Sequence, residues 1–283
     1  MSAVEAIELS FRRSLPSISS VVLISALTML LSTAYYMTAI SPSDFSELPK
    51  TREYENMARA VTRMDPWTRT QQYWANNITA GVAGGIGSLV YTGLNITVST
   101  SHFTGIAVTY VSHRYGGEAA LAFLAQIYLH GLLELTGLYL IAAGGLRLAW
   151  NVWIFAAEAT LKYGSGKPRK KNEPPAHTKL RTPLVDFFVL FLLGIFMIFL
   201  AAPIEAYVSS EASIFYEQPA TAIGFLIMVG AIYGSIVALG LKGVKNQTEK
   251  TVRYLRSKKF SPVHVAFVVL LIFFGLGIFR VIS

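Results

Sequence analysis

Three ionisable side chains lie inside otherwise apolar stretches of the sequence, where a charge is costly to bury and is usually paired or functional. His130 and Glu134 are four residues apart, so on a helix they share one face and can bond each other. Glu205 follows Pro203, whose missing N–H predicts a kink and free backbone carbonyls beside the carboxyl group. These three residues form the candidate polar cluster.

A fourth ionisable residue, Arg147, ends the apolar stretch that contains His130 and Glu134. On a helix that rises 1.5 Å per residue, it lies about 20 Å beyond Glu134. It therefore cannot neutralise Glu134 within the same chain unless the helix breaks. Gly144 and Gly145 could supply such a break. We expect Arg147 to lie at the cytoplasmic end of its span.

Three interpretations of the polar cluster remain open. It could be a buried polar knot that fixes helix packing with a protonated carboxyl group, a proton or ion pathway, or a metal site or intramembrane hydrolase. A zinc motif of the HExxH type needs two histidines and is absent, as are GxSxG, a phosphate-binding glycine loop and a Rossmann fingerprint. The sequence therefore predicts a protein that is not an enzyme and binds no cofactor or metal, with the hydrolase as the remaining alternative.

The overall composition explains why these charges stand out. Of 283 residues, 53% are hydrophobic and 14% are charged, against roughly 25% charged in soluble domains, and none is cysteine. This composition excludes a disordered chain, a disulfide-stapled secreted domain, a cysteine-ligated zinc protein and a thiol enzyme. It predicts an all-α, polytopic membrane protein formed as a single transmembrane domain over residues 1–283.

Apolar segments of roughly 20 residues, enough to cross a hydrocarbon core about 30 Å thick, recur along the chain. The segment 101–113 is short, and charge placement decides its assignment. If residue 73 is outside and residue 147 inside, an odd number of crossings must join them, so 101–113 becomes a third span. The predicted spans are 18–40, 74–100, 101–113, 119–146, 187–208, 220–241 and 263–279.

The basic residues set the predicted orientation, because short cytoplasmic loops collect Lys and Arg. Of the 24 basic residues, most lie in 147–182 and 242–260, while 210–219 has none. We therefore predict a multi-pass protein of the cell membrane with a cytoplasmic N-terminus. The segment 41–73 is then extracytoplasmic, and 150–182 and 242–260 are basic cytoplasmic loops.

The basic loops and the small residues predict the partners. The loops are expected to meet anionic lipid headgroups and protein partners, and they lack the interleaved aromatic residues of a nucleic-acid site. Small residues in the spans let helices approach closely, either within one chain or between two copies of it. We expect the protein to be a homodimer. The residues assigned to helix packing are Asn77, Gly81, Gly85, Gly144, Gly145, Gly230 and Gly234.

One motif resembles a known family. His130, Gly131 and Glu134 stand in HGLLEL, and Arg147 stands in the following AAGGLRL. This combination resembles the signature of the stage II sporulation protein M (SpoIIM-like) integral membrane family. Asn77 upstream and the IEAYVS segment containing Glu205 extend the resemblance over roughly 70–240, with Leu129 and Ala149 as departures from the usual pattern.

The resemblance implies a structural role in the membrane and no catalysed reaction. The family's best-known member anchors a cell-wall-degrading complex in the sporulating membrane, so the resemblance implies a non-enzymatic scaffold or remodelling component. In that interpretation His130, Glu134 and Glu205 hold a polar centre between spans. The alternative is a transporter or channel that uses Glu134 and Glu205 as a proton, ion or substrate pathway.

Overall fold

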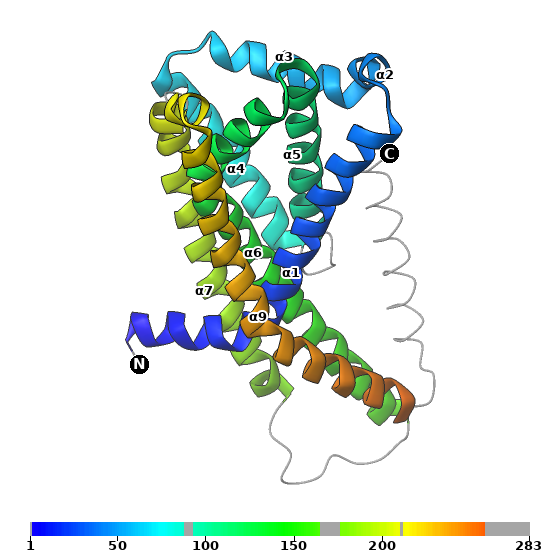
Figure 1. Cartoon of the computed structure of the whole chain (residues 1–283). Helices are drawn as coiled ribbons and strands as arrows, with labels where there is room; N and C mark the ends of the chain where they lie inside the picture. The colour runs from blue at the N-terminus through cyan, green and yellow to red at the C-terminus, as the bar shows by residue number, and fades with distance from the viewer. Residues whose placement is uncertain (1, 88–92, 165–175, 210–211, 258–283) are drawn as a thin grey trace.

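The computed structural model describes residues 2–87, 93–164, 176–209 and 212–257, and every regular element in these ranges is a helix (Figure 1). Four helical stretches are long and apolar enough to cross a membrane: Ala3–Ala39, Gly117–Ala156, Leu180–Val208 and Pro219–Asn246. The predicted all-α membrane fold is therefore confirmed at this level. The predicted seventh span, 263–279, lies outside the described residues.

The first helix, α1 (Ala3–Ala39), is bent. Ser2 starts it with a capping box to Glu5, and Pro16 lies inside it. Proline removes one backbone hydrogen bond and its ring crowds the preceding turn, which kinks a helix. The part before Pro16 consequently runs across one end of the bundle, while the remainder runs along the bundle axis (Figure 1). We call the end where the N-terminus lies the basic end, because the last part of α9 (Pro219–Ser257), which is rich in Lys and Arg, also lies there (Figure 1).

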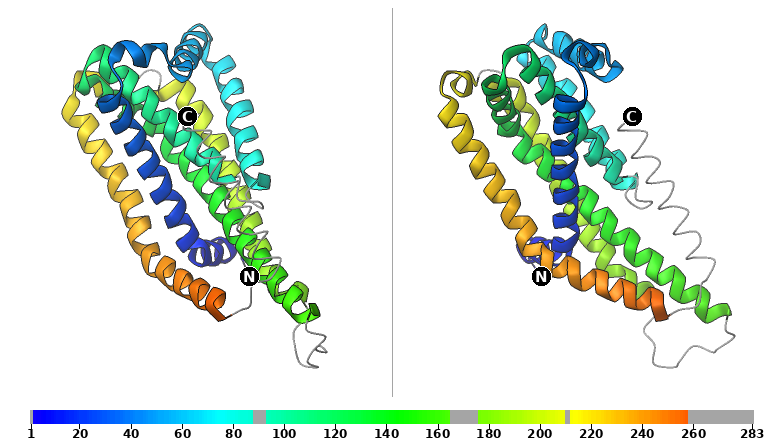
Figure 2. Two further views of the ribbon diagram at one scale, coloured as in Figure 1. Left: turned by 90° about the vertical axis from the view of Figure 1, so that its right-hand side faces the viewer. Right: turned by 45° about the vertical axis from the view of Figure 1, so that its right-hand side comes forward.

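Two short helices, α2 (Pro42–Glu47) and α3 (Pro49–Thr62), cover the opposite end of the bundle (Figures 1 and 2). Both begin with proline, which is tolerated in the first turn because that N–H has no helical partner. Phe45 of α2 is buried against Tyr36 and Ile106. The predicted extracytoplasmic segment 41–73 therefore packs on the bundle through its apolar side chains.

The next two helices correct one predicted boundary. The stretch 74–100 is not a single helix, because α4 (Pro66–Gly87) ends and α5 (Gly93–Tyr115) begins within it. Apolar counting could not detect this division, since the residues on both sides are uncharged. Gly87 stands at the end of α4 and Gly93 at the start of α5, and glycine weakens a helix interior. The short segment 101–113 is consequently part of a full-length helix.

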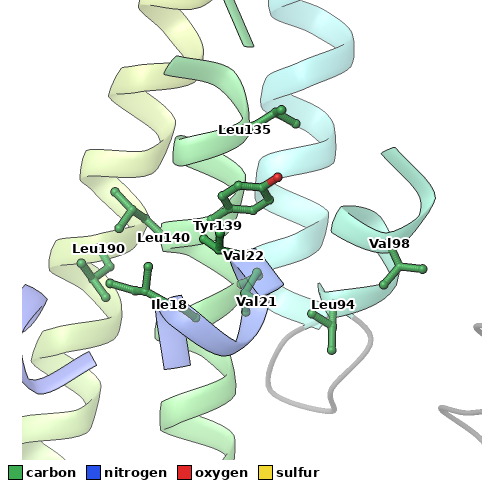
Figure 3. Close-up of a cluster of buried hydrophobic side chains, with 11 residues drawn as sticks. Ile18, Val21, Val22, Leu94, Val98, Leu135, Tyr139, Leu140 and Leu190 are labelled. Carbon is green, nitrogen blue, oxygen red and sulfur yellow. The ribbon is translucent and has the colours of Figure 1, made fainter. Parts of the chain in front are cut away.

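The longest helix, α6 (Gly117–Gly164), packs against α7 (Ala176–Pro203) along the core. A Cβ added to Gly194 would lie 2.5 Å from the Gly137 carbonyl oxygen, so the two backbones touch. Apolar side chains from α1, α5, α6 and α7 fill the adjoining core, including Val21, Tyr139 and Leu190 (Figure 3).

The last described helices complete the bundle. A π-helical turn, η2 (Ile204–Val208), continues α7, and α8 (Ile214–Glu217) precedes α9 (Pro219–Ser257). Both α6 and α9 continue past the rest of the bundle at the basic end (Figures 1 and 2). The segments 150–182 and 242–260, which the sequence predicts to be loops, are instead helical over 150–164, 176–182 and 242–257. None of these three ranges contains a proline that would interrupt the helix.

Candidate functional site

The His130 cluster, which we define as His130, Glu134 and Glu205, forms where α6 meets η2. The four-residue spacing places His130 and Glu134 on one face of α6, as the sequence predicts. The Nε2 atom of His130 lies 3.8 Å from Oε1 of Glu205. One ligand-type atom from each of the three residues lies within 4.8 Å of the others. The fold thus brings together all three intramembrane groups that the sequence singled out.

Pro203 explains how Glu205 reaches this position. Proline cannot donate the helical hydrogen bond to the carbonyl four residues earlier, which is that of Phe199. The indole Nε1 of Trp74 donates to this carbonyl at 2.8 Å instead, and the Trp74 ring stacks on Phe199 at 4.7 Å. The chain continues as η2, a π-helical turn of a kind common at functional sites.

A chain of hydrogen bonds holds the outer side of the His130 cluster. The Nδ1 atom of His130 lies 3.1 Å from the hydroxyl of Ser209, which is itself buried. The Gln126 side-chain amide donates to the Ser209 carbonyl, and the Tyr216 hydroxyl donates to Gln126 at 2.9 Å. The ring of His130 is therefore fixed by α8 and the end of η2 as well as by its own helix.

The two carboxyl groups of the cluster are less well satisfied. The side chains of His130 and Glu205 are only 12% and 20% exposed. Glu205 Oε2 is buried without a hydrogen-bond partner, and no hydrogen bond or ion pair within the described ranges reaches Glu134. Gly131, on the neighbouring face, has only ordinary contacts at its Cβ position. The cluster therefore keeps unused acceptor capacity.

Arg147 does not join this cluster, because α6 continues through Gly144 and Gly145 without a break. It pairs instead with Asp186 of α7, with Nη2 3.0 Å from Oδ2. Arg13 of α1 binds the same carboxylate at 2.6 Å. We call Arg13, Asp186 and Arg147 the Asp186 cluster. It joins three helices near the basic end.

Sequence reasoning missed Asp186. Its side chain is fully buried and also accepts a hydrogen bond from Ser10 at 2.8 Å. The predicted span began one residue later, at Phe187, and therefore placed this acid outside it. The available signal was that Asp186 is the one acid between the prolines at 183 and 203 in a strongly apolar segment.

The residues assigned to helix packing divide into two groups. A Cβ at Gly81, Gly85 or Gly144 would meet side chains of α7 within 3.3 Å. Gly145 is buried and Asn77 is half-buried. Gly230 and Gly234 face open space, with no heavy atom of the described structure within 4 Å of an added Cβ.

A small cavity lies elsewhere in the bundle. It has a volume of about 40 Å³ and is lined by residues of α1, α5, α6 and α9, including Ser25, Tyr139 and Tyr233. None of the three His130-cluster residues lines this cavity. The cluster is therefore separate from the lining of this cavity.

The comparisons with known proteins agree with the resemblance in the motif. The family model of stage II sporulation protein M matches residues 19–210, which contain both polar clusters except Arg13. No curated protein and no solved structure matches the chain at a significant level. The four apolar helices and the family match together indicate a membrane protein. With its model matched over most of the chain, the protein belongs to the stage II sporulation protein M family.

Proposed function

We propose that the protein is a non-enzymatic, multi-pass scaffold or remodelling component of the cell membrane. The observation that supports this role is the projection of α6 and α9 beyond the bundle at one end (Figure 1). The 48 residues of α6 extend about 72 Å, more than twice the hydrocarbon thickness. A helix of this length carries its end into the aqueous phase, where it can meet other proteins.

The charge of these projections favours a cytoplasmic position. Lys242 and Lys245 are exposed on the C-terminal part of α9, and further Lys and Arg residues follow in the sequence. Basic residues next to spans remain cytoplasmic and are attracted to anionic headgroups. The basic end is therefore assigned to the cytoplasm, together with the N-terminus, and α2 and α3 to the opposite side.

The proposed topology retains seven spans with shifted boundaries. At 22 and 23 residues, α4 and α5 are about 33–35 Å long, enough to cross the hydrocarbon core. With α6 they supply the three crossings that the charge argument requires between residues 73 and 147. The segment 263–279 would be the seventh crossing.

Single-cysteine labelling tests this topology, because the natural chain has no cysteine to interfere. We expect Ala60→Cys to react with a membrane-impermeant maleimide in intact cells. Lys245→Cys should react only after the membrane is permeabilised. Labelling of both positions from the same side would overturn the assignment.

Reconstitution separates the scaffold from the transporter. We expect proteoliposomes with the wild-type chain to show the same proton and divalent-cation flux as those with the Glu134→Gln/Glu205→Gln variant. The double variant should instead reduce assembly, measured by crosslinking between copies and to protein partners in cells. Flux that depends on the two carboxyl groups, with assembly retained, would favour the transporter.

A further inference from the structure

We propose that His130, Glu134 and Glu205 form a binding site for one divalent transition-metal ion, such as Zn²⁺, between α6 and η2. The proposal is independent of the scaffold role, since it concerns what the cluster binds rather than what the protein assembles. It rests on the positions of the three ligand groups, the hydrogen bonds behind the histidine and the unsatisfied carboxyl groups.

The three groups are close enough to share one ion. Their ligand-type atoms lie within 4.8 Å of one another, and the His130–Glu205 pair is separated by 3.8 Å. Ligands about 2.0–2.2 Å from a zinc ion lie about 3–3.5 Å apart. Small side-chain rotations of the two glutamates therefore close the site without moving α6 or η2.

The histidine is already oriented as a ligand. A metal-bound histidine normally donates its second ring N–H to a hydrogen-bond acceptor, which fixes the tautomer. Here Nδ1 of His130 faces the Ser209 hydroxyl at 3.1 Å, while Nε2 faces the carboxyl groups. At 3.8 Å from Glu205, Nε2 makes no hydrogen bond to that carboxyl group. In the tautomer that donates Nδ1–H to Ser209, its lone pair is available to a metal ion.

The electrostatics of the cluster also favour a cation. Glu134 and Glu205 approach each other in the protein interior, and no Lys or Arg in the described part of the chain pairs with either. Glu205 Oε2 is buried without a hydrogen-bond partner, and the Tyr73 hydroxyl is the neutral group that approaches this carboxyl. Buried carboxylates normally pair with a cation or coordinate a metal. A divalent ion would offset both charges and occupy the free oxygen.

The donor set indicates the class of metal. One imidazole nitrogen with two carboxylate oxygens suits Zn²⁺, Mn²⁺ or Fe²⁺, whereas Ca²⁺ and Mg²⁺ prefer oxygen ligands alone. Thiolate sites are excluded because the chain has no cysteine. Since the HxxxE pair occupies one helix and the third ligand comes from another, the sequence motif alone could not reveal a three-ligand site.

Metal binding to the purified full-length protein tests the proposal. After the protein is stripped with a chelator, reloaded with Zn²⁺ and freed of excess ion, we expect one Zn²⁺ per chain by elemental analysis. The melting temperature should be higher than that of the stripped protein. Glu205→Gln and His130→Gln should each weaken Zn²⁺ binding at least tenfold in titration calorimetry. Glu118→Gln, an exposed acid on the same helix, is the matched control and should bind as the wild type does.

A second variant covers the possibility that ligand substitutions unfold the protein. Ser209→Ala keeps all three ligands and removes only the hydroxyl beside His130 Nδ1, so we expect a 10- to 100-fold loss of Zn²⁺ affinity. Absence of stoichiometric Zn²⁺, Mn²⁺ and Fe²⁺ binding to the folded wild type would overturn the proposal. Binding that Ser209→Ala and the ligand variants leave unchanged would overturn it equally.

Discussion

At the residue scale, the buried carboxylate of Asp186 links α1, α6 and α7. Its carboxylate accepts hydrogen bonds from Arg13 and Ser10 of α1, and Arg147 of α6 pairs with it. Because the carboxylate is fully buried, these partners replace the water that it loses. The two arginines in turn depend on one negative charge, so the cluster has no spare counter-ion.

Substitution Asp186→Asn should therefore be strongly destabilising. Removing one partner leaves the Arg13 and Arg147 guanidinium groups without compensation, and breaking a buried pair costs about 3–5 kcal/mol. The melting temperature of the purified protein in detergent should fall clearly. The control is Glu8→Gln, which breaks the exposed pair to Arg12 and should change it little. Equal effects of the two variants would contradict a special role for Asp186.

Asp65 gives a pH-dependent prediction outside the spans. It caps α4 by accepting from the backbone N–H groups of Trp67 and Thr68 and from the Thr68 hydroxyl. The Thr68 hydroxyl, followed by these backbone groups, lowers the pKa of Asp65 below its ordinary value of 3.8. A lowered folded-state pKa adds stability above pH 3.8, and that stability is lost as the pH falls through the folded value.

The variant Asp65→Asn keeps a capping oxygen but cannot ionise. We expect it to melt at a lower temperature than the wild type at pH 7, with the difference shrinking as the pH falls below 3.8. Thermal scans of both proteins between pH 2 and pH 7 measure this difference. A gap that stays constant over this range would rule out the titration of Asp65 as its cause.

The sequence could identify some of these residues but not their partners. His130 and Glu134 were predictable as a pair, because helical spacing alone sets their separation. The approach of Glu205 depends on how α7 packs on α6 and on the π-helical turn after Pro203, which no local pattern encodes. Arg147 was identified as a helix-end charge, but its carboxylate partner came from another helix.

At the scale of elements, α6 and α7 pack most closely where Gly137 faces Gly194. Neither glycine was among the predicted packing residues, because each stands outside a dense glycine stripe. Their carbonyl oxygens lie 2.5–2.6 Å from where the opposite Cβ would be. Only glycine on both helices allows this backbone contact, which lets the α6 and α7 side chains of the core interlock.

Substitution Gly194→Ala should force α6 and α7 apart, because its methyl group would overlap the Gly137 carbonyl oxygen. Overpacking of this kind costs about 1–3 kcal/mol, measured as a lower melting temperature. Gly224→Ala on α9 is the control, since its added methyl group would meet open space and alanine favours a helix. A loss of stability in the control as large as in Gly194→Ala would point to a general effect of losing glycine.

At the scale of the whole molecule, α9 is the least enclosed of the four apolar helices. Only 11% of its most apolar window is buried, against 67% for α6. Gly230 and Gly234 lie on this exposed surface and form a GxxxG motif with nothing packed on it among the described residues. In lipid, such a motif favours close contact with another helix.

We accordingly expect homodimerisation through α9, which Gly230→Leu and Gly234→Leu should weaken without unfolding the chain. Light scattering of the protein in detergent should show a shift from dimer to monomer at an unchanged melting temperature. Gly224→Leu, about a third of a turn around α9 from Gly230, should remain dimeric. Dimers that survive both glycine substitutions would place the contact elsewhere.

The position of Asp186 in the sequence also sets an order of events during synthesis. Arg13 precedes its carboxylate partner by 173 residues. At about 5–20 residues per second, the ribosome needs about 9–35 s to add that length. During this interval α1 must enter the bilayer as a helix whose arginine has no counter-ion. Docking of the N-terminal segment across the basic end therefore belongs to a late stage of biogenesis, after α7 has been made.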